Sequence, residues 1–373
     1  MPRVSLTFLW EIPARTAPIF SVFIPFFGCP RRCVFCSQHD QTGQQASPLD
    51  EILARAAADL RARHQQGRPP VELAFYGGTF TALAPRDMDA CLDMADSLLR
   101  DGCITRFRCS TRPDSLDTAL LARLRRHGCR TVELGIQSFS DTALQASERH
   151  YSGRQAAEAC RLVRGAGLAL GVQLLPGMPG HQPEDFLTDV RRALALGADM
   201  LRFYPCLVLA GTELASRWQQ GLYTPWPLPL TLSLLARGWL DARRAGVPVI
   251  RMGLAPEPGM EAALLAGPVD RSLGGRVLGR ALWLHVCACL LRAQGDEAAR
   301  SGIRAAALLD ALLAGGGAHA GLPRARALYL PRACQGFFRG PGDELGQAWK
   351  ALGITRRNLV WTAGQAACLH LDA

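Results

Sequence analysis

Lysine is almost absent from this sequence of 373 residues, where Lys350 is the only one. A lysine that forms a Schiff base is therefore excluded before residue 350, which argues against pyridoxal phosphate chemistry. Long apolar runs are also missing: the best, Ala281–Leu291, is broken by His285 and is shorter than the roughly 18 residues of a membrane span. Glu11 and Pro13 stand where a secretory signal needs its apolar centre. We therefore expect a cytoplasmic protein without a membrane segment.

The composition is that of a globular chain with a basic surplus. Its hydrophobic fraction of 49% is ample for a core of barrel size plus a small appendage. The formal net charge of +10 is carried almost wholly by arginine, and no dense basic run is present. Such a surplus fits a polyanionic partner such as RNA or a phosphorylated substrate. The use of arginine in place of lysine also fits a bias in the base composition of the genome, without any polyanionic partner.

Short apolar segments alternate with helical ones from Ser21 onward, which predicts a parallel sheet of strand–helix units. We expect one long helical region over Asp141–Gly165 and a further strand over Val247–Met252. The six principal strands are expected at Ser21–Phe27, Val71–Tyr76, Arg106–Thr111, Thr131–Gln137, Leu168–Leu175 and Met200–Pro205. The fold class is therefore α/β, a partial (β/α)6 TIM-type barrel whose active site lies at the C-terminal ends of its strands.

The pattern changes after the sixth unit. We expect an N-terminal arm over residues 1–18, the barrel over 19–255 and a small α/β accessory region over 256–373. The accessory region is rich in alanine and glycine, and its role does not follow from its sequence.

Three cysteines follow the first expected strand with the spacing C-x3-C-x2-C: Cys29, Cys33 and Cys36. Three thiolates on one short loop suit an iron–sulfur cluster. A four-iron cluster held by three ligands keeps one iron free to bind a small molecule. A zinc site completed by His39 is an alternative. A disulfide is disfavoured, because thirteen cysteines are scattered through a chain without a secretory signal.

The motif C-x3-C-x-aromatic-C, with Phe35 before the last cysteine, resembles the signature of the radical S-adenosylmethionine (SAM) superfamily. This resemblance implies a 4Fe–4S cluster held by Cys29, Cys33 and Cys36. Its free iron would chelate the amino and carboxylate groups of SAM. Electron transfer from the cluster would then release a 5′-deoxyadenosyl radical.

Other segments at the expected strand ends agree with this resemblance. Gly77, Gly78 and Thr79 follow the second strand, where glycines let the backbone approach a ligand. Gln137 ends an apolar strand, and a polar amide there is costly unless it is hydrogen-bonded, so it is expected to face a ligand. The resemblance adds further candidate SAM contacts, namely Ser110 toward the ribose, Arg112 toward the carboxylate or the substrate, Arg149 toward the carboxylate, and Gln173 near the end of the fifth strand.

Arg112 and Cys206, which also follow expected strands, each carry two interpretations. Arg112 also fits a solvated loop arginine. Cys206 follows the sixth strand, where a thiol could donate hydrogen to a radical or could simply be a packed small side chain. Relatives that make haem precursors carry an aspartate where Gln173 stands, which speaks against that activity here.

Within the superfamily, the barrel is most similar to that of the Elongator catalytic subunit and its short bacterial relatives. The likeness rests on Gly77-Gly-Thr-Phe-Thr81, Ser110-Thr-Arg-Pro-Asp114, Val132-Glu-Leu-Gly-Ile-Gln-Ser138, Leu175-Pro-Gly-Met-Pro-Gly180 and Tyr204-Pro-Cys-Leu-Val-Leu-Ala-Gly-Thr212. Two features depart from the Elongator subunit: the first cysteine gap is narrower, and no glycine-rich acetyl-CoA loop follows the barrel. Its tRNA reaction therefore does not carry over.

These observations predict an enzyme that reductively cleaves SAM and starts radical chemistry on an unidentified substrate, with RNA as a candidate. An external donor such as flavodoxin or ferredoxin would supply the electron. Two alternatives belong to other classes: a cluster or cofactor carrier of the haem-chaperone type that works without turnover, and an RNA-binding module held together by zinc.

Overall fold

The computed structural model describes residues 4–9, 18–38, 47–254, 258–293, 303–314, 324–364 and 366–371. The chain divides into two compact units. The barrel unit comprises Arg15–Pro227 and Ala242–Val269, and the second unit comprises Met1–Ala14, Leu228–Asp241 and Asp270–Ala373. The domain boundaries expected at residues 18 and 255 remain predictions.

The barrel unit is built on one seven-stranded sheet in the order β2-β3-β4-β5-β6-β7-β9, in which every neighbouring pair is parallel. Because β2 and β9 lie at the two edges, the barrel is open. The strands are β2 (Ile19–Phe23), β3 (Val71–Tyr76), β4 (Ile104–Thr111), β5 (Cys129–Gln137), β6 (Ala169–Leu174), β7 (Met200–Phe203) and β9 (Val249–Met252). The sheet confirms the α/β partial-barrel fold class, and β9 is the further strand expected after the sixth unit.

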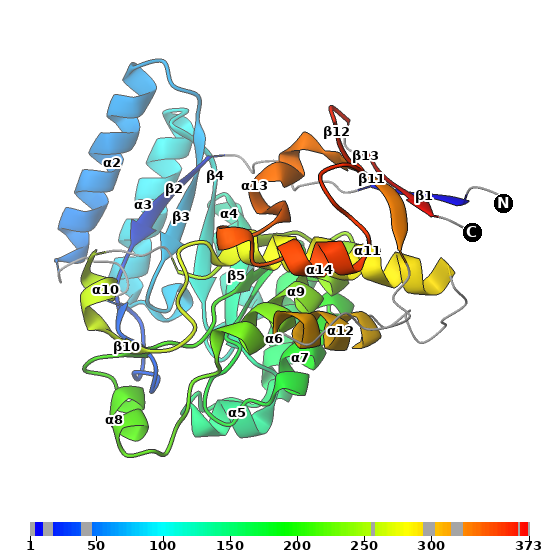
Figure 1. Ribbon diagram of the computed structural model, residues 1–373. Helices are drawn as coiled ribbons and strands as arrows, with labels where there is room; N and C mark the ends of the chain where they lie inside the picture. Colours follow the sequence, from blue (N-terminus) through cyan, green and yellow to red (C-terminus); the bar gives the residue numbers. More distant parts are fainter. Residues whose placement is uncertain are drawn as a thin grey trace. The chain divides into compact units, whose positions relative to one another are not determined.

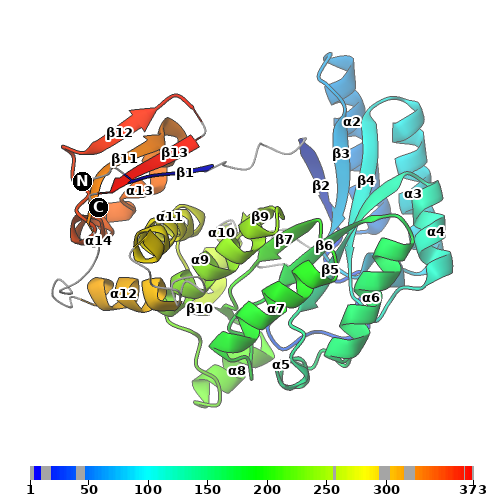
Figure 2. The same cartoon turned by 90° about the vertical axis from the view of Figure 1, so that its right-hand side faces the viewer.

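Helices follow the strands and cover the outer face of this sheet (Figures 1 and 2). They are α2 (Leu49–Gln65), α3 (Pro85–Arg100), α4 (Thr118–Arg126), α6 (Gly153–Gly165) and α7 (Pro183–Ala195), and the short α5 (Asp141–Ala146) lies in the connection from β5 to α6. Helix α2 shows why: Leu49, Leu53 and Leu60 recur at helical spacing and are buried. Strand β3 is buried along both faces, as a parallel strand between helices and a filled interior should be.

Smaller elements complete the unit after β7. They are β8 (Val208–Leu209), α8 (Glu213–Gln219), α10 (Pro258–Ala263) and β10 (Leu264–Ala266), and β10 pairs with β8 in an antiparallel two-stranded sheet. Helix α9 (Leu228–Arg244) belongs to the second unit up to Asp241.

Two expectations from the sequence need correction. Strand β2 ends at Phe23 rather than Phe27, because Pro25 has no amide hydrogen and Phe26 takes a φ of 61°. The helical region expected over Asp141–Gly165 is two helices. Glu148 and His150 lie between them with φ of 55° and 56°, a backbone conformation that a right-handed helix cannot contain.

The second unit has a four-stranded sheet in the order β1-β13-β11-β12. Its strands are β1 (Val4–Leu9), β11 (Ala325–Pro331), β12 (Leu359–Thr362) and β13 (Ala366–Leu371), and its other helices are α11 (Leu273–Ala293), α12 (Ile303–Leu313), α13 (Gln335–Phe338) and α14 (Gly346–Ala351). The first strand pairs antiparallel with the last. Short 3-10 turns at Phe80–Ala82, Arg332–Cys334 and Pro341–Asp343 complete the described elements.

Helix α11 is long and apolar enough to cross a membrane by length and composition alone. Most of its side chains are nevertheless buried within the second unit, among them Trp283 and Val277. The helix also carries Arg280, which is 3% exposed and donates to Glu344 Oε1 at 2.7 Å. The core helix of a globular protein can have the same length and composition, and the burial and ion pair of α11 are those of such a core helix.

Candidate active site

A cavity of about 820 Å³ opens at the C-terminal ends of the barrel strands and extends into the barrel interior. Its position is the one expected for an active site in this fold. All the site residues expected from the sequence line it: Cys29, Cys33, Cys36, Gly77, Gly78, Thr79, Ser110, Arg112, Gln137, Arg149, Gln173 and Cys206. The structure therefore brings them together, and their individual roles remain predictions.

The cysteine loop, residues 28–38, follows β2 and is held by backbone contacts. The Cys29 amide donates to the Phe26 carbonyl at 3.0 Å, and the Cys36 amide donates to the Cys33 carbonyl at 3.0 Å. Val34 is 2% exposed and accepts a hydrogen bond from the Leu214 amide of α8. The three cysteines are free thiols of intermediate exposure. The loop is thus fixed at both ends while its sulfurs face the cavity.

The glycine loop after β3 lies directly against the cysteine loop. Gly78 has a φ of 57°, and a Cβ there would meet the Phe27 carbonyl oxygen at 2.1 Å. Likewise, a Cβ at Gly28 would meet the Thr79 carbonyl oxygen at 2.3 Å. The Gly78 amide donates to Gln38 Oε1 at 2.9 Å. Only glycine allows the two backbones to approach this closely, so one function of these glycines is to seat the cysteine loop.

The three thiols have different surroundings. Cys29 Sγ lies 3.3 Å from the Thr79 hydroxyl, and Cys33 Sγ accepts from Arg149 Nη1 at 2.9 Å. Burial, and then the nearby Cys33 and Cys29, raise the pKa of Cys36 to about 12. Burial also raises the pKa of Cys29. Crowded, buried thiols of this kind lose their protons most readily when a metal ion binds to their sulfurs.

Two arginines approach Cys33 from different elements. Arg112 follows β4 and forms a two-pronged pair with Asp114, at 2.9 and 2.7 Å. Its Nη1 lies 3.8 Å from Cys33 Sγ. Arg149 lies in the loop between α5 and α6, and its carbonyl accepts from Arg112 Nη2 at 2.7 Å. The Arg112 guanidinium is therefore tied to the backbone of Arg149, and both side chains reach the same sulfur.

Gln137 ends β5 with an unusual backbone and an unused acceptor. Its φ is 67°, which is uncommon for a residue other than glycine. The side chain is buried, and its Oε1 has no hydrogen-bond partner within the described chain. A buried polar atom without a partner is costly, so this amide has capacity for a ligand in the cavity.

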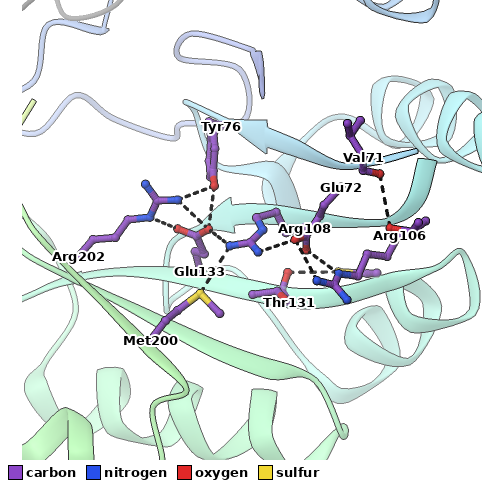
Figure 3. Close-up of polar contacts among 11 residues, drawn as sticks. Val71, Glu72, Tyr76, Arg106, Arg108, Thr131, Glu133, Met200 and Arg202 are labelled. Carbon is purple, nitrogen blue, oxygen red and sulfur yellow. Dashed lines mark hydrogen bonds and ion pairs between the residues drawn. The ribbon is translucent and has the colours of Figure 1, made fainter. Parts of the chain in front are cut away.

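A charged network reaches the same cavity through Tyr76, Glu133 and Arg202. We call it the floor network; Figure 3 shows its contacts, and the sequence did not predict it. Glu133 Oε1 accepts from Tyr76 Oη at 2.9 Å, from Arg108 at 3.0 Å and from Arg202 at 3.1 Å. Arg108 Nη2 continues to Glu72 Oε2 at 2.6 Å. These side chains come from β3, β4, β5 and β7, so the network ties four strands together.

The electrostatics of this floor network follow from its burial. Burial alone would raise the pKa of the Glu72 carboxyl, but hydrogen bonds from Arg108 and Arg106 outweigh it and hold the pKa below its usual value. Burial and the adjacent Glu133 carboxylate raise the pKa of Tyr76. A sequence signal existed for Glu72, Glu133 and Arg202: each interrupts an apolar stretch of its strand, where a charge needs a partner.

Comparison with known proteins places this geometry in a family. The profile of the Radical SAM superfamily matches residues 23–193, and that of the Radical_SAM C-terminal domain matches residues 198–277. The chain belongs to the radical SAM superfamily. The first match includes the cysteine loop, the glycine loop and Arg149, and the second runs from β7 past β10.

The curated relatives match part of their own length. A tRNA uridine(34) acetyltransferase of Dehalococcoides mccartyi is 31% identical over 241 residues, 56% of this chain and 52% of the relative. The heme chaperone HemW of Escherichia coli is 25% identical over 203 residues, 54% of each chain. The chain therefore spans about half the length of these relatives. Among solved structures, the archaeal Elp3 of Methanocaldococcus infernus matches with a TM-score of 0.54 at 20% identity, over 71% of this chain and 62% of that one, which shows a shared fold.

The residues present fit the two groups that radical SAM proteins use. Three cysteine sulfurs, which become soft ligands when a metal displaces their protons, face a cavity where guanidinium groups and a hydroxyl would offset the thiolate charge. Gln137 offers an unused acceptor beside them, and SAM carries an amino group that can donate. No group of three or more His, Cys, Asp or Glu side chains in the described part of the chain is arranged around a single metal ion. His39, the fourth ligand of the zinc alternative, lies outside the described residues.

Cys206 lies on the cavity wall after β7. It is 2% exposed, its amide donates to the Pro176 carbonyl at 2.9 Å, and burial raises its pKa to about 12. Tyr223 interacts with this thiol and donates to the Gly177 carbonyl at 2.6 Å. Both of the sequence-based interpretations, hydrogen donor and packed side chain, remain predictions.

Proposed function

We propose that this protein is a radical SAM enzyme that binds a 4Fe–4S cluster at Cys29, Cys33 and Cys36 and cleaves SAM reductively. The single observation that carries the proposal is the convergence of the cysteine loop, the glycine loop and Gln137 on one cavity. When bound, the cluster and SAM together supply a carbon-centred radical that can abstract hydrogen from a substrate.

The chain's own residues have three tasks in this proposal. The thiolates hold the cluster, and the glycine loop keeps the cysteine loop in register with β3. Gln137 orients SAM through its free amide oxygen, while Ser110 and Gln173 line the same cavity as further contacts. A cavity of this volume lies within the roughly 300–1,000 Å³ of ligand sites, so it can shield reacting groups from water.

The lining of the cavity is basic, which favours an anionic substrate. Arg31, Arg32 and Arg251 are exposed and line it. Glu133 is the one carboxylate among the described lining residues, and Arg108 and Arg202 already engage it. We therefore extend the proposal to RNA as substrate, in the cytoplasm, with flavodoxin or ferredoxin as electron donor. The name of the Dehalococcoides relative, a tRNA uridine(34) acetyltransferase, agrees with RNA.

The test is anaerobic incubation of cluster-loaded protein with dithionite and SAM. We expect 5′-deoxyadenosine, measured by liquid chromatography, and faster formation when total RNA is added. If 5′-deoxyadenosine forms at the same rate with and without RNA, RNA is not the substrate, and the proposal of a radical SAM enzyme stands.

A second candidate is a chaperone that carries haem without turnover. It is favoured by relatives named heme chaperone HemW, one of which matches 54% of this chain. An intact cluster that yields no 5′-deoxyadenosine, together with haem binding by the same preparation, would support the chaperone. Zinc in place of iron would support the RNA-binding module.

A further inference from the structure

Arg149 occupies the break between α5 and α6, flanked by two non-glycine residues with positive φ. The Arg149 amide donates to the Leu144 carbonyl at 2.9 Å, which fixes the backbone of this turn on α5. The side chain points back into the barrel and is 4% exposed. A buried guanidinium group needs several partners, so its contacts show what it is positioned for.

Two of the three guanidinium nitrogens of Arg149 are committed to the protein. Nη2 donates to the Gly135 carbonyl at 2.6 Å, and Nε donates to the Tyr151 hydroxyl at 2.9 Å. Tyr151 is itself held by the carbonyls of Gly135 and Ile136, at 3.0 and 2.8 Å. These bonds to β5 leave Nη1 aimed at Cys33 Sγ at 2.9 Å.

Arg112 repeats the arrangement at longer range. Its Nε and Nη2 are held by Asp114, and Nη2 also donates to the Arg149 carbonyl. Its remaining nitrogen, Nη1, lies 3.8 Å from Cys33 Sγ. Both arginines therefore present one nitrogen to the same sulfur.

We propose that Arg149, assisted by Arg112, is a positioning residue that raises the reduction potential of the bound cluster through the Cys33 sulfur. The inference rests on the proposed cluster at Cys29, Cys33 and Cys36. It departs from the sequence-based expectation for Arg149, a contact to the SAM carboxylate. Reduction adds negative charge to a cluster, and a nearby cation that donates to a ligand sulfur stabilises the reduced form. Arg149, whose nitrogen lies nearer Cys33 Sγ, should therefore favour reduction more than Arg112 does.

The test is an anaerobic redox titration of the cluster, followed by electron paramagnetic resonance and carried out without SAM. We expect Arg149→Met to shift the midpoint potential to more negative values and Arg112→Met to shift it less in the same direction. Arg154→Met is the matched control, because Arg154 lies on α6, pairs with Glu158 at the surface and is not among the residues that line the cavity. This control loses the same charge, and we expect the wild-type potential.

Two further measurements keep the inference falsifiable. Arg149→Lys retains the charge, and its potential is expected between those of wild type and Arg149→Met; if Arg149→Met fails to hold iron, Arg149→Lys and Arg112→Met decide. SAM affinity, read from the spectral change of the reduced cluster, is measured in parallel. Unchanged potentials with a large loss of SAM affinity in the Arg149 variants would overturn the inference and restore the carboxylate contact. Failure of wild-type protein to hold a cluster would instead overturn the proposed function.

Discussion

Two polar clusters line the same cavity, and they differ in how fully their groups are engaged. On the floor, Glu133 is engaged by Tyr76, Arg108 and Arg202, so its charge is matched within the fold. Glu72 Oε1 and Arg202 Nε lack a hydrogen bond within the described chain but lie within ion-pair distance of an opposite charge, which leaves Arg108 Nε as the unsatisfied atom of this network. We call the part of the cavity lined by Cys29, Cys33, Cys36 and Gln137 its mouth; there, three thiols face the cavity and Gln137 keeps a buried oxygen without a partner in the described chain. Closed networks of charge stabilise a structure, whereas unused donors and acceptors mark a place for ligands. The comparison therefore assigns stability to the floor and chemistry to the mouth.

The largest expected effect is at the mouth. Cys33→Ala should remove the bound iron and the absorbance near about 400 nm that cysteine-ligated clusters show. The matched control is Cys368→Ala, the same change on β13 of the second unit. Iron content is the measurement. Full iron in the Cys33 variant would show that the ligand assignment is wrong.

A substitution in the floor network should instead lower the free energy of unfolding of the protein. Glu133→Gln leaves the buried Arg108 and Arg202 without their shared carboxylate, and removing one partner of a buried ion pair costs about 3–5 kcal/mol. Glu158→Gln, which breaks an exposed pair with Arg154 on α6, should cost at most about 1 kcal/mol. Chemical denaturation of the metal-free proteins compares the two. Equal losses would mean that the floor is not the stabilising cluster.

The contact between the two loops can be tested with a glycine pair. Both Gly78 and Gly67 have positive φ, so the cost of placing an alanine in that conformation cancels when the two variants are compared. We expect Gly78→Ala to destabilise the protein by about 1–3 kcal/mol more than Gly67→Ala, because of the contact that the new Cβ makes. A Cβ at Gly67 meets nothing within 4 Å, whereas one at Gly78 meets the Phe27 carbonyl at 2.1 Å. Thermal or chemical unfolding gives the difference. Identical stabilities would show that the loops separate without cost.

The smallest effect is expected at Gln137. Gln137→Asn keeps an amide and a residue that tolerates positive φ, but its shorter side chain withdraws the free oxygen from the cavity. We expect SAM affinity to fall about tenfold, which corresponds to about 1.4 kcal/mol, with stability changed by less than about 0.5 kcal/mol. Spectral titration of the reduced cluster measures the affinity. A loss of stability with unchanged affinity would place Gln137 with the floor instead.

The barrel could be predicted well from the sequence, because the pattern that specifies each strand and helix lies within that element. Each strand–helix unit carries its own apolar pattern, so Val71–Tyr76 was predicted with the bounds that the structure shows. The break at Glu148 and His150 escaped prediction, because positive φ at non-glycine residues has no reliable sequence signature. The pairing of β1 with β13 joins the two ends of the chain, and no local pattern indicates so distant a partner.

The candidate site divides in the same way. The cysteines, glycines and Gln137 are read from motifs at strand ends, and the structure brings them to one cavity. The floor network was missed because Glu72, Arg108 and Arg202 are separate charges in separate strands, and only folding joins them. The direction of Arg149 toward Cys33 likewise depends on bonds to β5 that sequence does not encode locally.

The most direct test of the difference between floor and mouth is whether the mouth binds a 4Fe–4S cluster and SAM at the same time. Protein reconstituted without oxygen should hold about four irons per chain, as one 4Fe–4S cluster requires. After reduction, its electron paramagnetic resonance spectrum should change when SAM is added. A reduced cluster whose spectrum is identical with and without SAM, or a chain that binds no iron, would contradict the account.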